Sequence, residues 1–222
     1  MYPENFGEWM SIDETALSNG ELYTVITNKD RHGKKGCLAA LIKGTKNEIV
    51  SEALAKVPIQ KRMAVKEITA DLAESMDWIC RTNFMNARLT ADRFHVQQVV
   101  SDAVQEIRVH LRRKAIDEEN ELIVLTKKER IPYHPQRYSN GDTKKQLLAR
   151  GRYLLFKPSN TWSESQRQRA DILFKEYPEI KKAYDFSMYF RGIFENSKIR
   201  EDAKKRFQQW MNKVSASAIP TL

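Results

Sequence analysis

The sequence predicts an α/β fold in which a mixed sheet is followed by an all-helical region. Over residues 1–95, short apolar runs alternate with helically spaced ones, whereas from Val96 the spacing is helical almost throughout. The charge changes at the same place. Residues 1–95 contain 13 Lys/Arg and 13 Asp/Glu, and residues 96–222 contain 25 Lys/Arg and 16 Asp/Glu. We therefore expect a sheet-forming part, 1–95, and a basic helical part, 96–222.

The first part begins with three short runs of strand-forming residues. Ser-Asn-Gly and RHGKKG separate these runs, which predicts two hairpins. A helically spaced segment then stops before Pro58, and two further strands follow with a helix between them. The expected order is strand 8–14, strand 21–28, strand 36–44, helix 47–57, strand 65–71, helix 72–84, strand 87–92 and a long helix from about Phe94.

Three hairpin-linked strands and two helical crossovers make a mixed sheet with helices packed over it. This order matches the ribonuclease H-like fold, in which a three-strand meander is extended by two crossover strands that join the first strand. The sequence therefore predicts that the first and fourth strands are neighbours.

The second part is predicted to be an all-helical insertion. After a turn-rich segment, 131–145, residues 146–156 fit a helix or a strand equally well. A helix then begins at Ser163, where Gln166 completes a capping box, and two more follow over 178–196 and 200–217. The apolar stripe of the first long helix comprises Val96, Val99, Val100, Ala103, Val104, Ile107 and Leu111.

Composition narrows the class of protein. No window approaches the roughly 18 apolar residues of a membrane span, and the N-terminus lacks signal-peptide character, so a cytoplasmic protein is expected. Two cysteines are too few for a disulfide framework or a cysteine-based zinc site. The net charge of +9 lies entirely in the second part, which favours nucleic acid as partner over the alternative of solvated helix faces.

Three aspartates end expected strands: Asp13, Asp71 and Asp92. If the first and fourth strands are neighbours, Asp13 and Asp71 approach each other, and two such carboxylates repel unless a cation bridges them. Mg²⁺ or Mn²⁺ prefers these oxygen ligands, and metal ions so held activate phosphodiester chemistry. The alternative for each acid alone is a turn or a helix N-cap, and Asp71 before LAESM suits that role.

Four stretches carry a family resemblance: WMSIDETALSNGELYTVITNKD, GKKGCLAALIKGTK, VKEITADLAESM and LTADRFHVQQ. In this order they resemble the DDE transposases of bacterial insertion sequences, ISL3 group. The resemblance implies a Mg²⁺-dependent (or Mn²⁺-dependent) catalytic core that cleaves DNA at transposon ends and joins it to target DNA. Asp13 and Asp71 match the first and second catalytic, metal-binding aspartates, and Asp92 and His95 match a D-x-F-H motif near the site.

The resemblance also implies partners and a location. These are DNA, a homodimer or a full-length transposase, and a bacterial cytoplasm with nucleoid association. The basic residues expected to contact DNA phosphates are Arg108, Arg112, Arg113, Lys144, Lys145, Arg150 and Arg152.

Two features of the family are expected but not found in the sequence. One is the third catalytic acid, a glutamate after the insertion, and the other is an N-terminal zinc-binding and helix-turn-helix region. The sequence-based expectation is a fragment with impaired activity. The alternative is a non-catalytic DNA-binding or oligomerising remnant that regulates a full-length enzyme.

Overall fold

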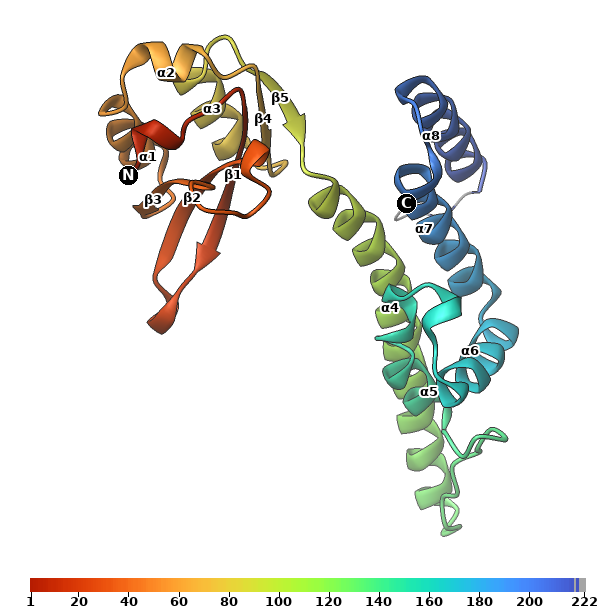
Figure 1. Cartoon of the computed structure of the whole chain (residues 1–222). Helices are drawn as coiled ribbons and strands as arrows, with labels where there is room; N and C mark the ends of the chain where they lie inside the picture. The colour runs from red at the N-terminus through yellow and green to blue at the C-terminus, as the bar shows by residue number, and fades with distance from the viewer. Residues whose placement is uncertain (218, 220–222) are drawn as a thin grey trace. The chain divides into compact units, whose positions relative to one another are not determined.

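A computed structural model describes residues 1–217 and 219, which form two compact units (Figure 1). The first unit is Met1–Val96 and the second is Gln97–Leu222, and each is considered separately below. Within the described residues, no helix is both long and apolar enough to cross a membrane.

The first unit contains a five-stranded mixed sheet in the order β3-β2-β1-β4-β5. The meander is antiparallel, and β1 pairs parallel with β4, which pairs parallel with β5. The predicted α/β, ribonuclease H-like order of strands is therefore confirmed. The strands are β1 (Trp9–Ala16), β2 (Leu22–Asn28), β3 (Leu38–Lys43), β4 (Glu67–Ala70) and β5 (Arg88–Ala91).

Three helices accompany the sheet: α1 (Asn47–Ala55), α2 (Ile59–Met63) and α3 (Glu74–Asn83). The strands alternate buried and accessible residues, so Met10 and Ile12 of β1 lie in the core while Ser11 between them faces the opposite side. Val50 of α1 and Ile79 of α3 belong to the same core. The helical crossovers thus cover one face of the sheet. The other face carries Ser11 and Asp13 together with exposed apolar residues such as Trp9 and Leu41.

Short 3-10 turns complete the first unit, and the five-residue α2 was not expected. The turns are η1 (Pro3–Asn5), η2 (Ser18–Gly20) and η3 (Lys29–Arg31). Pro58 is the N-cap of α2, so it ends the preceding helical pattern and begins a new turn.

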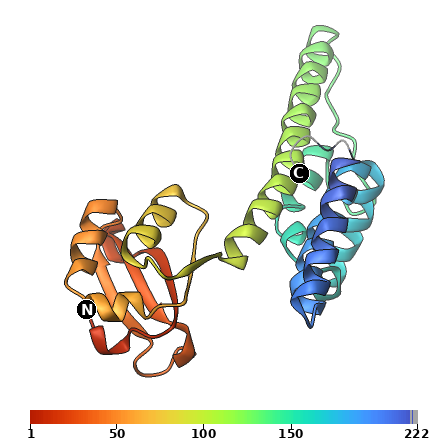
Figure 2. The ribbon, with the colours of Figure 1, turned by 90° about the horizontal axis from the view of Figure 1, so that it is seen from above.

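In the second unit, α6, α7 and α8 pack in succession (Figure 2). Ser163 and Gln166 form the predicted capping box at the start of α6. The segment 146–156, which fitted a helix or a strand, forms the end of α5 (Lys144–Arg150), a turn and the 3-10 helix η4 (Leu154–Phe156). Its four leucines are buried in the core of this unit. The helices are α4 (Arg93–Lys128), α5 (Lys144–Arg150), η4 (Leu154–Phe156), η5 (Ser159–Thr161), α6 (Glu164–Glu176), α7 (Pro178–Asn196) and α8 (Arg200–Ser215).

Candidate active site

The register of the sheet aligns the three strand-end aspartates. β1 pairs with β4 up to Ser11 opposite Thr69, and continuing that register by two residues places Asp13 level with Asp71. The β4–β5 register, continued by one residue beyond Ala70, places Asp71 level with Asp92. Residues at one level of neighbouring parallel strands face the same side. The aspartates therefore form a row on the face away from the core.

His95 lies between the two carboxylates of Asp13 and Asp71. Its Nε2 atom is 3.8 Å from Asp13 Oδ1, and its Nδ1 atom is 3.8 Å from Asp71 Oδ1. These distances exceed those of hydrogen bonds, so the imidazole attracts both carboxylates mainly when it is protonated. The structure thus brings Asp13, Asp71 and His95 together, and Asp92 lies beside Asp71 in the same row.

The alternative role of a helix N-cap applies to Asp92 and not to Asp71. Asp92 Oδ1 accepts a hydrogen bond of 2.8 Å from Phe94 N at the start of α4, so Asp92 caps that helix. The N-cap of α3 is Ala73, and the hydrogen bond that Asp71 accepts among the described residues comes from the next residue, Leu72. Asp71 is therefore available for a role other than capping.

Glu14 is a member of this acidic edge that the sequence did not predict. The pKa of its carboxyl is raised by burial first, and then by the negative charges of Asp71 and Asp13. Adjacent residues of a regular strand point to opposite faces, so its position beside Asp13 in the sequence does not indicate proximity to Asp71. Glu14 therefore lies within electrostatic range of both aspartates, although burial is the larger cause of its raised pKa.

The site residues fit a divalent cation. Among the described residues, neither Asp13 nor Asp71 forms an ion pair with a lysine or an arginine. Mg²⁺ characteristically takes one or two protein carboxylates and completes its shell with waters and phosphate oxygens. No group of three or more His, Cys, Asp or Glu side chains within 1–217 and 219 is arranged to hold a metal. The fit therefore rests on a two-carboxylate donor set.

The order and directions of the strands define a fold of the ribonuclease H-like class. The chain belongs to the DDE transposases of the ISL3 group, since the model of that family, described as Transposase, matches residues 10–222. Members of the DDE transposase family act on DNA and generally use divalent metal ions. No curated protein matches the chain significantly.

Arg108, one of the expected phosphate contacts, is instead buried in the second unit and is only 6% exposed. Its Nε donates to Gln105 Oε1 at 2.7 Å and its Nη1 donates to Leu148 O at 3.0 Å. Burial lowers the pKa of its guanidinium, and the charges of Arg152 and Arg112 lower it further. The sequence pattern missed this because Arg108 adjoins the apolar stripe of α4, where α5 packs. We therefore remove Arg108 from the set of DNA contacts.

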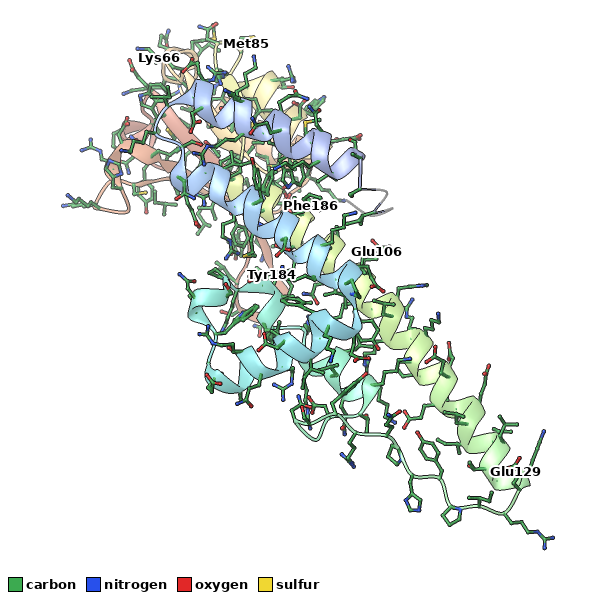
Figure 3. The ribbon with its side chains drawn as sticks, turned by 90° about the vertical axis from the view of Figure 1, so that its right-hand side faces the viewer. Lys66, Met85, Glu106, Glu129, Tyr184 and Phe186 are labelled. Carbon is green, nitrogen blue, oxygen red and sulfur yellow. The ribbon has the colours of Figure 1, made fainter. Side chains whose placement is uncertain are left out.

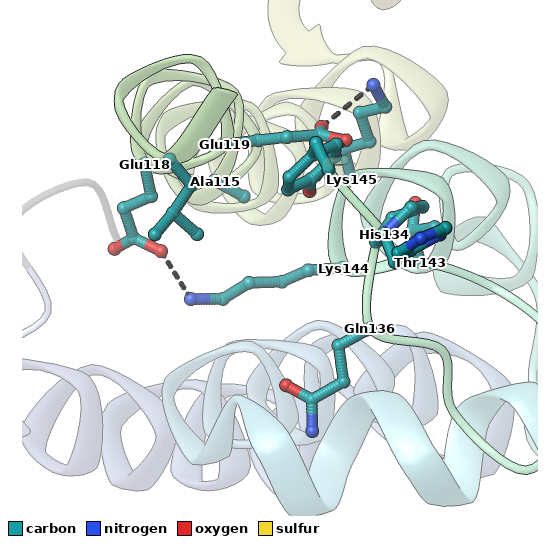
Figure 4. Close-up of a pocket in the computed structure, with 11 residues that line it drawn as sticks. Ala115, Glu118, Glu119, His134, Gln136, Thr143, Lys144 and Lys145 are labelled. Carbon is teal, nitrogen blue, oxygen red and sulfur yellow. Dashed lines mark hydrogen bonds and ion pairs between the residues drawn. The ribbon is translucent and has the colours of Figure 1, made fainter. Parts of the chain in front are cut away.

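Three of the other expected contacts form ion pairs within the second unit. Lys144 Nζ lies 2.5 Å from Glu118 Oε2, and Lys145 Nζ lies 2.7 Å from Glu119 Oε2 (Figure 4). Arg150 pairs with the buried Asp142. These pairs fasten α5 and the preceding loop to the unit, which leaves the side chains less free to follow a DNA backbone.

The remaining three, Arg112, Arg113 and Arg152, are exposed and form no ion pair among the described residues. Arg152 follows α5, and its guanidinium lies over the Tyr153 ring, 5.5 Å from the centroid. The charges of Arg112 and Arg152 both act on Arg108, so each of the two lies within electrostatic range of that buried guanidinium. Such a cluster attracts anions, because its cations repel one another when no anion is present.

Proposed function

We propose that this transposase chain carries out metal-dependent cleavage and transfer of DNA strands, with Asp13 and Asp71 binding Mg²⁺ or Mn²⁺. The observation that supports this proposal is the register of β1 and β4. It brings to one level of the sheet two carboxylates that have no Lys or Arg partner among the described residues. A divalent ion bound there would supply Lewis-acid polarisation of a phosphodiester and activation of the attacking oxygen.

The side chains of the chain itself would bind and orient the reacting groups. The two aspartates hold the cation, and His95 borders both carboxylates. Asp92 would act indirectly, by fixing the start of the helix that carries His95.

The basic helical unit would hold the DNA backbone. Arg112, Arg113 and Arg152 are the proposed phosphate contacts, because their charges are exposed and are not neutralised by acids within the described residues. Lys144, Lys145 and Arg150 would contact phosphate only by giving up the acidic partners described above, so we propose a secondary role for them.

Metal binding and strand cleavage test the catalytic part of the proposal. Mn²⁺ binding is measured by isothermal titration calorimetry, and cleavage is measured as nicking of supercoiled plasmid in the presence of Mg²⁺ or Mn²⁺. We expect Asp13→Asn and Asp71→Asn to abolish both signals. Asp30→Asn is the matched control, because Asp30 is an exposed acid of the same unit that lies outside the row.

The outcomes separate two functions. Loss of Mn²⁺ binding in both variants, together with metal-dependent nicking by the unchanged chain, supports the catalytic role. Plasmid binding without any nicking, and Mn²⁺ binding unaffected by both substitutions, would instead favour a DNA-binding or oligomerising protein that regulates another transposase.

A further inference from the structure

The end of α4 carries an unusual run of exposed apolar residues. Leu122, Ile123, Val124 and Leu125 are consecutive in the helix, and each is between 38% and 53% exposed. A soluble surface rarely presents four such residues in a row unless they serve to bind something.

This part of the helix is well formed. Glu129 N donates to Leu125 O at 3.1 Å, and Ile131 N donates to Thr126 O at 2.9 Å. Arg130 has a φ of 58°, the left-handed conformation that closes a helix C-terminus. Figure 3 shows Glu129 at the end of a continuous helix that extends well beyond Glu106. The apolar residues therefore belong to a regular helix end with a left-handed C-terminal residue.

Two different faces of the helix contribute to the run. Leu122 follows Leu111 and Ala115 at helical spacing, and it lines a hollow with Tyr133 of the returning chain. Val124 and Leu125 lie on another face, where they line a second, largely apolar hollow with Glu121. The second hollow is lined by residues of α4 alone, so no other segment among the described residues of the unit lines this face.

Charged residues flank the apolar pair on this second face. Glu121 precedes Val124 by about one turn, and Lys128 follows it by about one turn. We call the face formed by Glu121, Val124, Leu125 and Lys128 the α4 tip face. Along the helix it reads acid, apolar, apolar, base.

We propose that the α4 tip face binds the same face of a second copy of the chain, antiparallel and about a two-fold axis between Val124 and Leu125. The arrangement that places Val124 opposite Leu125 of the other copy also places Glu121 opposite Lys128. Both contacts then occur twice, as in any isologous interface. The face is thus complementary to itself: apolar residues meet apolar residues, and each acid meets a base.

The charge order selects the antiparallel pairing. A parallel pairing would place Glu121 against Glu121 and Lys128 against Lys128, and like charges at such positions are destabilising. The antiparallel pairing also opposes the two helix dipoles favourably. Association would bury Val124 and Leu125 of both copies, and the removal of this apolar surface from water favours the dimer. This inference does not rest on the proposed catalytic function.

Sedimentation equilibrium of the full chain tests the pairing through a charge swap. We expect the unchanged chain to form a reversible dimer. Glu121→Lys alone and Lys128→Glu alone each replace two attractive pairs by two repulsive ones, which should weaken dimerisation roughly tenfold. The double variant restores opposite charges at both positions, so its dimerisation should return to within about twofold of the unchanged chain.

Two further variants complete the experiment. Leu125→Ser should weaken the dimer because it removes apolar contact area from the centre of the face. Lys127→Glu is the matched control, because Lys127 is exposed and lies about 100° around the helix from Lys128. It should leave dimerisation unchanged. Circular dichroism checks that each variant retains its helical content.

Each contrary result would overturn the proposal. A chain that remains monomeric at every soluble concentration has no self-association through this face. A dimer that is insensitive to Leu125→Ser uses another surface. A double variant as weak as the single ones shows that Glu121 and Lys128 do not face each other, as does a Lys127→Glu variant that is equally weak.

Discussion

The guanidinium cluster of the second unit makes a sharp prediction about DNA binding. Replacing both Arg112 and Arg152 by Gln removes two exposed positive charges and preserves much of the side-chain length. Arg108, which lies near both, is buried and engaged by Gln105 and by the backbone of Leu148. The prediction is that the exposed pair contacts phosphate and that the buried arginine does not.

The magnitude follows from counterion release. Each phosphate contact on duplex DNA contributes about 0.9 to the slope of log K against log salt concentration. Loss of two contacts should therefore reduce the slope by about 1.8. Between about 50 and 200 mM salt, the affinity advantage of the unchanged chain over the double variant should shrink roughly tenfold.

Fluorescence anisotropy with a labelled DNA duplex, measured over that range of salt, gives the slopes directly. Arg108→Gln is the informative comparison, because it should lower the free energy of unfolding while leaving the slope unchanged. Lys204→Gln, at an exposed lysine of α8, serves as a surface control. Equal slopes for the unchanged chain and the Arg112/Arg152 variant would refute the assignment, and so would a slope reduced by Arg108→Gln.

Two further predictions concern stability and thiol chemistry. Asp142→Asn should lower the free energy of unfolding in urea at pH 7 by about 2–3 kcal/mol, because this buried carboxylate forms ion pairs with Arg150 and Arg169. Burial alone would raise the pKa of Asp142, but the hydrogen bonds from Arg169 and Arg150 outweigh it and lower the pKa. The stabilisation by Asp142 is therefore complete above the pKa of about 3.9 that the carboxyl has in the unfolded chain, and it is lost as the pH falls through the lower pKa of the folded chain. The unchanged chain and the Asp142→Asn variant should therefore become equally stable in acid. A difference that stays constant with pH would contradict this. Burial raises the pKa of the Cys80 thiol to about 12. In the folded chain, iodoacetamide at pH 8 should therefore alkylate Cys37 and leave Cys80 unmodified. Mass spectrometry of the peptides would show which cysteine is alkylated.

Local patterns were sufficient to predict the architecture of the first unit. Alternating and helical periodicities located all five strands, and their order implied that β1 and β4 are neighbours. From there the positions of Asp13 and Asp71 at strand ends were enough to predict their proximity. The prediction succeeded because strand register converts positions in the sequence into positions across the sheet.

The basic unit was harder to predict. Charge alone grouped Arg108 with Arg112 and Arg152, yet the structure buries the first and exposes the others. Lys144 and Lys145 likewise have acidic partners some 26 residues earlier in α4. Such pairings depend on how α5 packs on α4, and no periodicity within either helix encodes that packing.

The sequence by itself determined the strand order, the row of acids and the membership of a transposase family, because these depend on local periodicity and on motifs contiguous in the chain. Only the tertiary structure placed His95 between two carboxylates and showed that the charges of these carboxylates act on Glu14. It also distinguished buried from exposed arginines and revealed the unpaired face of α4. Burial and electrostatic proximity are properties of neighbours in space, and packing between elements distant in the sequence decides which neighbours a side chain has.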